Sequence, residues 1–165
     1  PVNRTSGSVT QTKKLVFRVD PIVSKGIFYV ARLNYLRWEY WSPAPSGLVV
    51  EGDRVRAWTG GPGRRVEQPE ARAEAARMAA GQVMIWMDLN PEAIMAAYEV
   101  TVVRPEPLFL SVTPKRSGVR KFLKRLEVEF NSDGRTVRRV SLYEKESTTT
   151  LFFDGIRLNR PKPID

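Results

Sequence analysis

The chain has 165 residues, of which 42% are hydrophobic, enough for one domain with a buried core. It contains no cysteine and no histidine, which excludes disulfides, thiolate chemistry and the commonest general base and metal ligand. Its net charge is +9, and no apolar run approaches the ~18 residues of a membrane-spanning helix. These features favour a basic globular domain and weaken the case for catalysis.

The first third of the chain predicts an antiparallel meander. Residues 1–14 are polar and predict a partly irregular start. In residues 14–19, Leu15, Phe17 and Val19 alternate with other residues, which predicts a half-buried strand. The sequence EGD at 51–53 predicts a tight turn between two short strands. The two strands around this turn are predicted at 48–50 and 54–58, and further strands at 26–32 and 34–41. In residues 34–41, Leu36, Trp38 and Tyr40 share one face.

The middle of the chain predicts three helices. Residues 68–82 are rich in alanine and have a proline near their start and Gly81 near their end, as helices often do. The apolar residues 83–89 predict a second helix. Asn90, followed at once by a proline, predicts the capped start of a third.

Strand patterns return after Tyr98, with a turn predicted at NSDG, residues 131–134. This order indicates an α+β fold, with one long antiparallel sheet and helices against one face. We expect a single domain over residues 1–165, with strands in about 8–59, a helical segment in about 67–98 and strands in about 99–154.

The helical segment holds all four methionines, and two interpretations of them stay open. Either these residues, together with Trp86, simply face a filled core, or they line a cavity for a variable apolar ligand. The four methionines are Met78, Met84, Met87 and Met95.

No catalytic or metal site is predicted, and no cofactor. The aspartates at 53, 88, 133 and 154 stand in probable turns or caps, where short acidic side chains bond locally. Glu39 has no second carboxylate that the sequence places beside it. The sequence GGPG at 60–63 lacks the Lys-Ser/Thr of a phosphate-binding loop.

Basic residues are densest at KRSGVRKFLKR, residues 115–125. No nucleic-acid motif accompanies them, so we expect a solvated basic face and no nucleic-acid partner. For a carrier protein, such a run would touch an anionic membrane surface or an acidic partner.

The whole pattern resembles the periplasmic outer-membrane lipoprotein carrier family (LolA-like). The resemblance rests on SKGIFYVARLNYLRWEYWSP at 24–43, LFLSVTPK at 108–115 and TTTLFFDGIRLNRPKP at 148–163, in this order and spacing. One departure is Leu33, because the family has proline after the corresponding arginine.

The resemblance implies an unclosed half β-barrel whose concave face is covered by the helical insert, with a hydrophobic cavity between them. It implies a monomeric, non-enzymatic periplasmic carrier of lipoprotein acyl chains or another lipid. An inner-membrane ABC transporter would supply the cargo and an outer-membrane acceptor would receive it. The alternative is a small enzyme or sensor that binds a different hydrophobic ligand in the same cavity.

The resemblance also assigns residues. Arg32 would tie the helical lid to the sheet and gate the cavity. The cavity itself would be lined by Phe28, Val30, Leu36, Trp38, Met84, Trp86, Met87, Leu108, Leu110 and Val112.

Overall fold

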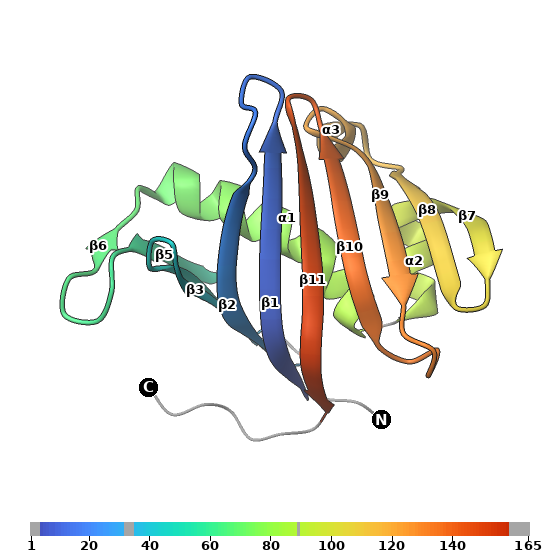
Figure 1. Ribbon diagram of the computed structural model, residues 1–165, viewed down its shortest axis with the longest axis horizontal. Coiled ribbons are helices and arrows are strands. Elements are labelled where there is room, and N and C mark those ends of the chain that lie inside the picture. The colour runs from blue at the N-terminus through green and yellow to red at the C-terminus, as the bar shows by residue number, and fades with distance from the viewer. Residues whose placement is uncertain (1–3, 32–34, 89, 159–165) are drawn as a thin grey trace. The chain divides into compact units, whose positions relative to one another are not determined.

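The computed structural model describes residues 4–31, 35–88 and 90–158 (Figure 1). Its strands form one antiparallel sheet in the order β6-β5-β4-β3-β2-β1-β11-β10-β9-β8-β7. The two end strands of this order do not pair with each other, so the described sheet is unclosed. The expected α+β class with a long antiparallel sheet is therefore confirmed.

Strands outnumber helices in the described part of the chain, and the elements follow one another closely. In chain order they are β1 (Arg4–Leu15), β2 (Ile22–Ala31), β3 (Tyr35–Ser42), β4 (Ser46–Glu51), β5 (Arg54–Thr59), β6 (Val66–Glu67), α1 (Glu70–Asp88), α2 (Pro91–Ala97), β7 (Tyr98–Pro105), β8 (Leu108–Pro114), α3 (Ser117–Arg120), β9 (Leu123–Phe130), β10 (Val137–Glu144) and β11 (Ser147–Leu158).

The chain divides into two compact units. Unit 1 comprises residues 1–10, 24–88 and 154–165, and unit 2 comprises residues 11–23 and 89–153. In unit 1, α1 packs against β5 and β4. In unit 2, α2 packs against β7, and α3 packs against β8 and β9.

Local signals predicted several turns and caps correctly. The Asn90 side chain accepts hydrogen bonds from the backbone N–H groups of Glu92 and Ala93, at 3.0 and 3.3 Å, and so caps α2. In the NSDG turn, Asp133 accepts from the backbone N–H groups of Arg135 and Thr136 at 2.9 and 3.0 Å. The hydrogen bond from Arg135 is the main reason that the pKa of Asp133 is lowered.

The start of the chain differs from the prediction. Strand β1 covers Arg4–Leu15, so it begins before residue 8, where the strands were expected to start, and it includes polar residues that were expected to be partly irregular. It ends where the half-buried strand of residues 14–19 was expected to begin. Residues 16–21 form the exposed loop between β1 and β2. Alternation in residues 14–19 was misleading, because an apolar residue at every second position also occurs by chance in a loop.

The helical segment also differs from the prediction. One helix, α1, covers both of the first two predicted helices, because it continues through Gly81 instead of ending there. A β-carbon added at Gly81 would meet nothing within 4 Å, so no packing contact explains this glycine.

Candidate functional site

One face of the unit 1 sheet is a continuous apolar surface. Strand pairing places its side chains in two parallel rows that cross β2, β3, β4 and β5, because directly opposite residues in a sheet share a face. The first row is Phe28, Trp38, Leu48 and Ala57, and the second is Val30, Leu36, Val50 and Val55. All are buried except Val55, which is half-buried.

Aromatic contacts hold the first row together at the β2–β3 pair. The ring centroids of Phe28 and Trp38 lie 5.6 Å apart, and Tyr40 meets Trp38 edge-to-face at 6.5 Å. Burial is the main reason that the pKa of Tyr40 rises to about 12, and a hydrogen bond with Trp38 lowers it in part. Tyr40 therefore stays neutral at physiological pH.

Helix α1 contributes a second set of apolar side chains to unit 1. Trp86 is fully buried, Met87 is buried and Met84 is half-buried. Burying a side chain of this size stabilises the fold by about 1.5–3 kcal/mol. The opposite side of the helix is more open, since Met78 is 47% exposed.

Unit 2 carries an apolar face of the same kind. Its two rows cross β8, β9, β10 and β11, and all of their side chains are buried. The rows are Leu110, Val128, Val140 and Leu151, and then Val112, Leu126, Leu142 and Thr149.

The structure brings the predicted cavity residues together in two groups. Phe28, Val30, Leu36 and Trp38 stand on one face of unit 1, and Met84, Trp86 and Met87 stand on the helix that packs against strands of the same unit. Leu108, Leu110 and Val112 belong to unit 2, where Leu108 is half-buried and the other two are buried. Arg32 lies outside the described residues.

Sequence reasoning missed several residues of these two faces. In unit 1 the missed residues are Leu48, Val50, Val55 and Ala57; the hairpin turn at 51–53 pairs Leu48 with Ala57 and Val50 with Val55. In unit 2 they are Leu126, Val128, Val140, Leu142 and Leu151, of which the first four alternate with polar residues in their strands.

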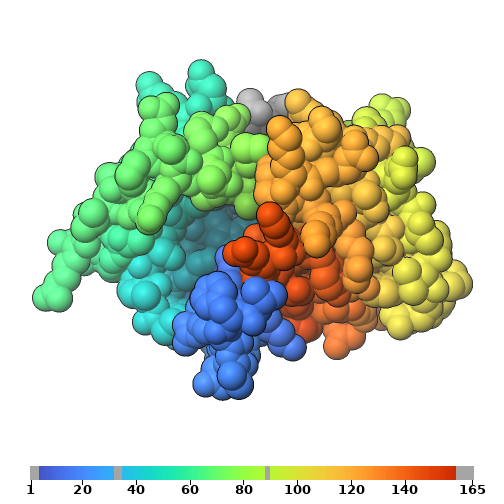
Figure 2. Space-filling view, turned by 90° about the horizontal axis from the view of Figure 1, so that it is seen from above, coloured from blue at the N-terminus to red at the C-terminus, as the bar shows by residue number. Residues whose placement is uncertain are grey.

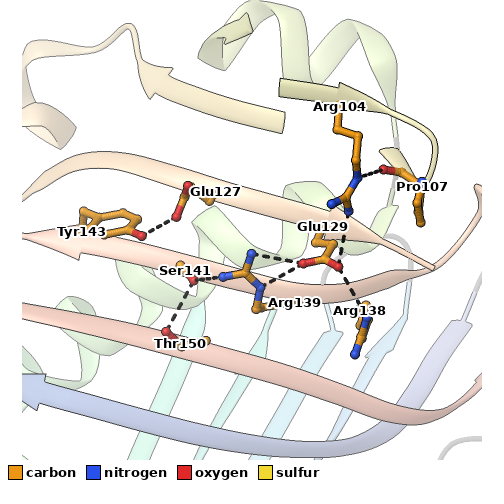
Figure 3. Close-up of polar contacts among 9 residues, drawn as sticks. All are labelled: Arg104, Pro107, Glu127, Glu129, Arg138, Arg139, Ser141, Tyr143 and Thr150. Carbon is orange, nitrogen blue, oxygen red and sulfur yellow. Dashed lines mark hydrogen bonds and ion pairs between the residues drawn. The ribbon is translucent and has the colours of Figure 1, made fainter. Parts of the chain in front are cut away.

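The opposite face of unit 2 carries a cluster of paired charged side chains (Figure 3). Glu129 forms ion pairs with Arg139 at 3.1 Å, Arg138 at 3.4 Å and Arg104 at 3.6 Å. Arg139 also donates to Ser141 at 3.2 Å. Along the same face, the Tyr143 hydroxyl donates to Glu127, and this hydrogen bond is the main reason that the pKa of Tyr143 is raised.

Glu39 lies in a comparable network in unit 1, on the face opposite the apolar rows. Arg37 and Arg65 pair with it at 3.0 and 3.5 Å. Among the described residues, no three acidic side chains gather as a metal site would require, and no helix is long and apolar enough to cross a membrane.

Comparisons with known proteins give one family. The family model described as outer membrane lipoprotein carrier protein LolA matches residues 2–163. Among curated protein sequences, none matches the chain significantly.

Several solved structures are similar to this chain at low sequence identity. A LolA superfamily protein from Nitrosomonas europaea is 9% identical with a TM-score of 0.43, over 99% of this chain and 89% of that one. A DUF1329 family protein from Desulfovibrio piger is 12% identical with a TM-score of 0.42, over 96% and 86%. The MucA/MucB complex of Pseudomonas aeruginosa gives 13% identity and a TM-score of 0.48, over 98% of this chain and 53% of that one.

Proposed function

Because the chain belongs to the outer membrane lipoprotein carrier (LolA) family, we propose that it is a non-enzymatic carrier of lipoprotein acyl chains in the periplasm. The observation that supports this most directly is the double row of apolar side chains across β2 to β5. On this proposal the carrier is one domain over residues 1–165, and it works as a monomer.

The chemistry of these rows suits a hydrocarbon ligand. Transfer of a methylene group from water to an apolar surface contributes about 0.8 kcal/mol, so an acyl chain needs no polar contact to bind strongly. Trp38 and Leu36 occupy the centre of the rows and are proposed to line the binding cavity. The predicted lining residues of α1 and β8 belong to the same proposal.

The rows are covered in the described structure, since Leu36 and Trp86 are fully buried. A ligand therefore enters only when a covering element moves. We assign this movement to the helical segment, with α1 as the main part of a lid over the concave face and with Arg32 gating it. On this proposal the cargo is loaded from an inner-membrane ABC transporter and released to an outer-membrane acceptor. Closure of the emptied cavity then offsets the free energy of binding that is lost on release.

The alternative, an enzyme or sensor for a different hydrophobic ligand, would use a polar group on the apolar face. Tyr40 is a titratable group there, and its raised pKa keeps it protonated. A protonated phenol offers one hydrogen bond to a ligand but no base at neutral pH. This property favours the carrier.

Binding of a synthetic triacylated lipopeptide tests the proposal. Native mass spectrometry of the purified chain should show a one-to-one complex, and palmitate should displace the lipopeptide. Retention of a different small molecule through purification, with no lipopeptide complex, would support the enzyme or sensor instead.

Two tryptophans of β3 that differ in exposure provide the matched variants. Trp38 is 9% exposed in the apolar row, whereas Trp41 is 55% exposed. Trp38→Ala should weaken lipopeptide binding at least tenfold, and Trp41→Ala should leave it unchanged. Trp38→Leu, which keeps an apolar side chain, should retain most of the affinity and so separates lost binding from lost folding. Equal affinity in all three variants would contradict the proposal.

A further inference from the structure

One end of the unit 2 sheet gathers three connections that are far apart in sequence. They are the β1–β2 loop (residues 16–21), the β8–β9 connection with α3 (residues 115–122) and the β10–β11 turn (residues 145–146). The backbone N–H of Val16 donates to the carbonyl oxygen of Glu146 at 3.1 Å, and Glu144 stands opposite Leu123. We call this surface the loop end; Figure 2 looks down on it, with the blue loop beside the red-orange turn.

Several apolar side chains are exposed to solvent at the loop end. Val16 is 77% exposed, Phe17 74% and Val19 100%, all within four residues of one loop. Phe122, in the β8–β9 connection, is 38% exposed. Single exposed apolar residues are common on proteins, but a group of this kind on a projecting loop marks an interaction site.

The same three connections are rich in cations. Besides Lys115, which donates to the carbonyl oxygen of Met95, seven exposed lysines and arginines belong to the three connections or to the adjoining ends of their strands, against three carboxylates, Asp20, Glu144 and Glu146. The seven cations are Lys14, Arg18, Arg116, Arg120, Lys121, Lys124 and Lys145.

Within the part of the chain that the structure describes, these seven cations have no side-chain partner, in contrast to the three arginines around Glu129. None of the seven forms an ion pair or a side-chain hydrogen bond with another described residue, whereas Arg104, Arg138 and Arg139 all pair with Glu129. The positive charge of the loop end is therefore available to an anionic partner.

We propose that the loop end docks on the surface of an anionic phospholipid bilayer. Phe17 and Val19 enter the interface between head groups and acyl chains, and the surrounding cations contact the lipid phosphates. A bilayer offers apolar and anionic partners at the same surface, which is the combination that this end of the sheet presents. A nucleic acid would use the cations but would give the exposed Val16 and Val19 no apolar partner.

This proposal does not rest on the cargo. Docking involves side chains on the outside of one end of unit 2, whereas the carrier proposal involves the apolar faces of the sheet. A chain that binds lipopeptide but not vesicles would overturn only the docking proposal, and the reverse result would overturn only the carrier proposal.

Vesicle binding tests the docking proposal. We expect the chain to co-sediment with phosphatidylcholine vesicles that contain 30% phosphatidylglycerol and not with pure phosphatidylcholine. Binding should weaken strongly as NaCl is raised from 50 to 500 mM, because salt screens charges at a surface. Equal binding to both kinds of vesicle, or no binding to either, would overturn the proposal.

Variants separate the charge from the apolar contact. Arg120→Gln/Lys121→Gln/Lys124→Gln should lower affinity for the anionic vesicles about 100-fold, at roughly fivefold for each cation. The matched control, Arg54→Gln/Arg64→Gln/Arg135→Gln, removes the same charge from outside the loop end and should have little effect. Phe17→Ser/Val19→Ser should also weaken binding, whereas Val102→Ser/Val103→Ser, which alters two exposed apolar residues of β7, should not.

Insertion is measured at the loop itself. Because the chain has no cysteine, Phe17→Cys provides a single site for an environment-sensitive dye. The dye emission should shift to the blue on adding anionic vesicles. An unchanged emission, together with binding of single-stranded DNA that is tighter than binding of vesicles, would replace the bilayer with nucleic acid as the partner.

Discussion

The ring of Trp58 lies directly against Gly47, its cross-strand partner in the β4–β5 pair. A β-carbon built on Gly47 would fall 2.2 Å from Cζ2 of that ring. The guanidinium of Arg65 lies 4.5 Å from the ring centroid and also pairs with Glu39. Trp58 is 4% exposed, so this arrangement buries an aromatic ring on the face of unit 1 opposite the apolar rows.

Gly47→Ala is expected to destabilise the protein by about 1–3 kcal/mol, because the new methyl group displaces a buried ring that also contacts the guanidinium of Arg65. Urea unfolding followed by far-UV circular dichroism measures the change. Gly61→Ala serves as a control, since its β-carbon would meet only Pro45 at an ordinary 3.7 Å. A Gly47→Ala variant as stable as the control would show that the Trp58 ring moves freely.

Gly81→Ala is expected to stabilise the protein by about 0.5–1 kcal/mol. Glycine lowers the stability of a helix interior, and a methyl group at this position of α1 has open space around it. The same unfolding measurement applies. Ala79→Gly, an exposed position of the same helix, should give a loss of similar size. If Gly81→Ala does not stabilise the protein, then α1 does not unfold cooperatively with the rest of the chain.

Tyr40 is expected to make stability depend on alkaline pH. The folded state raises its pKa to about 12, against about 10 in an unfolded chain, so the neutral side chain is favoured on folding. This contribution is present below about pH 10 and falls as the pH rises to about 12, with a total loss of at most about 3 kcal/mol. Tyr40→Phe removes the ionisation, so the variant should lose less stability than the parent between pH 9 and 11.5. If the free energy of unfolding falls equally with pH in the parent and in Tyr40→Phe, ionisation of Tyr40 does not cause the loss of stability.

Glu129→Gln is expected to destabilise the protein by about 1–2 kcal/mol. The carboxylate is only 17% exposed and pairs with three arginines, which lose a common partner in the variant. Adding 1 M NaCl should reduce the difference between variant and parent. Glu67→Gln, whose carboxylate is 55% exposed and pairs with Arg56, should cost less than about 0.5 kcal/mol. Equal losses of stability in Glu129→Gln and Glu67→Gln would show that the three arginines around Glu129 add nothing to the stability of the fold.

Some features of the fold depend on short segments alone, and these were predicted. The cap at Asn90 and the turn at Asp133 each consist of hydrogen bonds between residues at most three positions apart. The side-chain faces of β3 and β8 follow from the two-residue repeat of any strand. Leu36, Trp38 and Tyr40 were therefore placed correctly on a common face from the sequence alone.

Turns, helix caps and the residues that share a strand face could thus be predicted from the sequence, because they depend on neighbours in the chain. The end of β1 at Leu15 and the exposure of Phe17 and Val19 could not be predicted, since they depend on long-range contacts such as the backbone hydrogen bond from Val16 to Glu146, 130 residues later. The position of the basic run at 115–125, at the same end of unit 2 as the β1–β2 loop, depends on such contacts too. Such placements depend on strand pairing over long sequence separations, and a local pattern carries no information about which distant strand will be its partner.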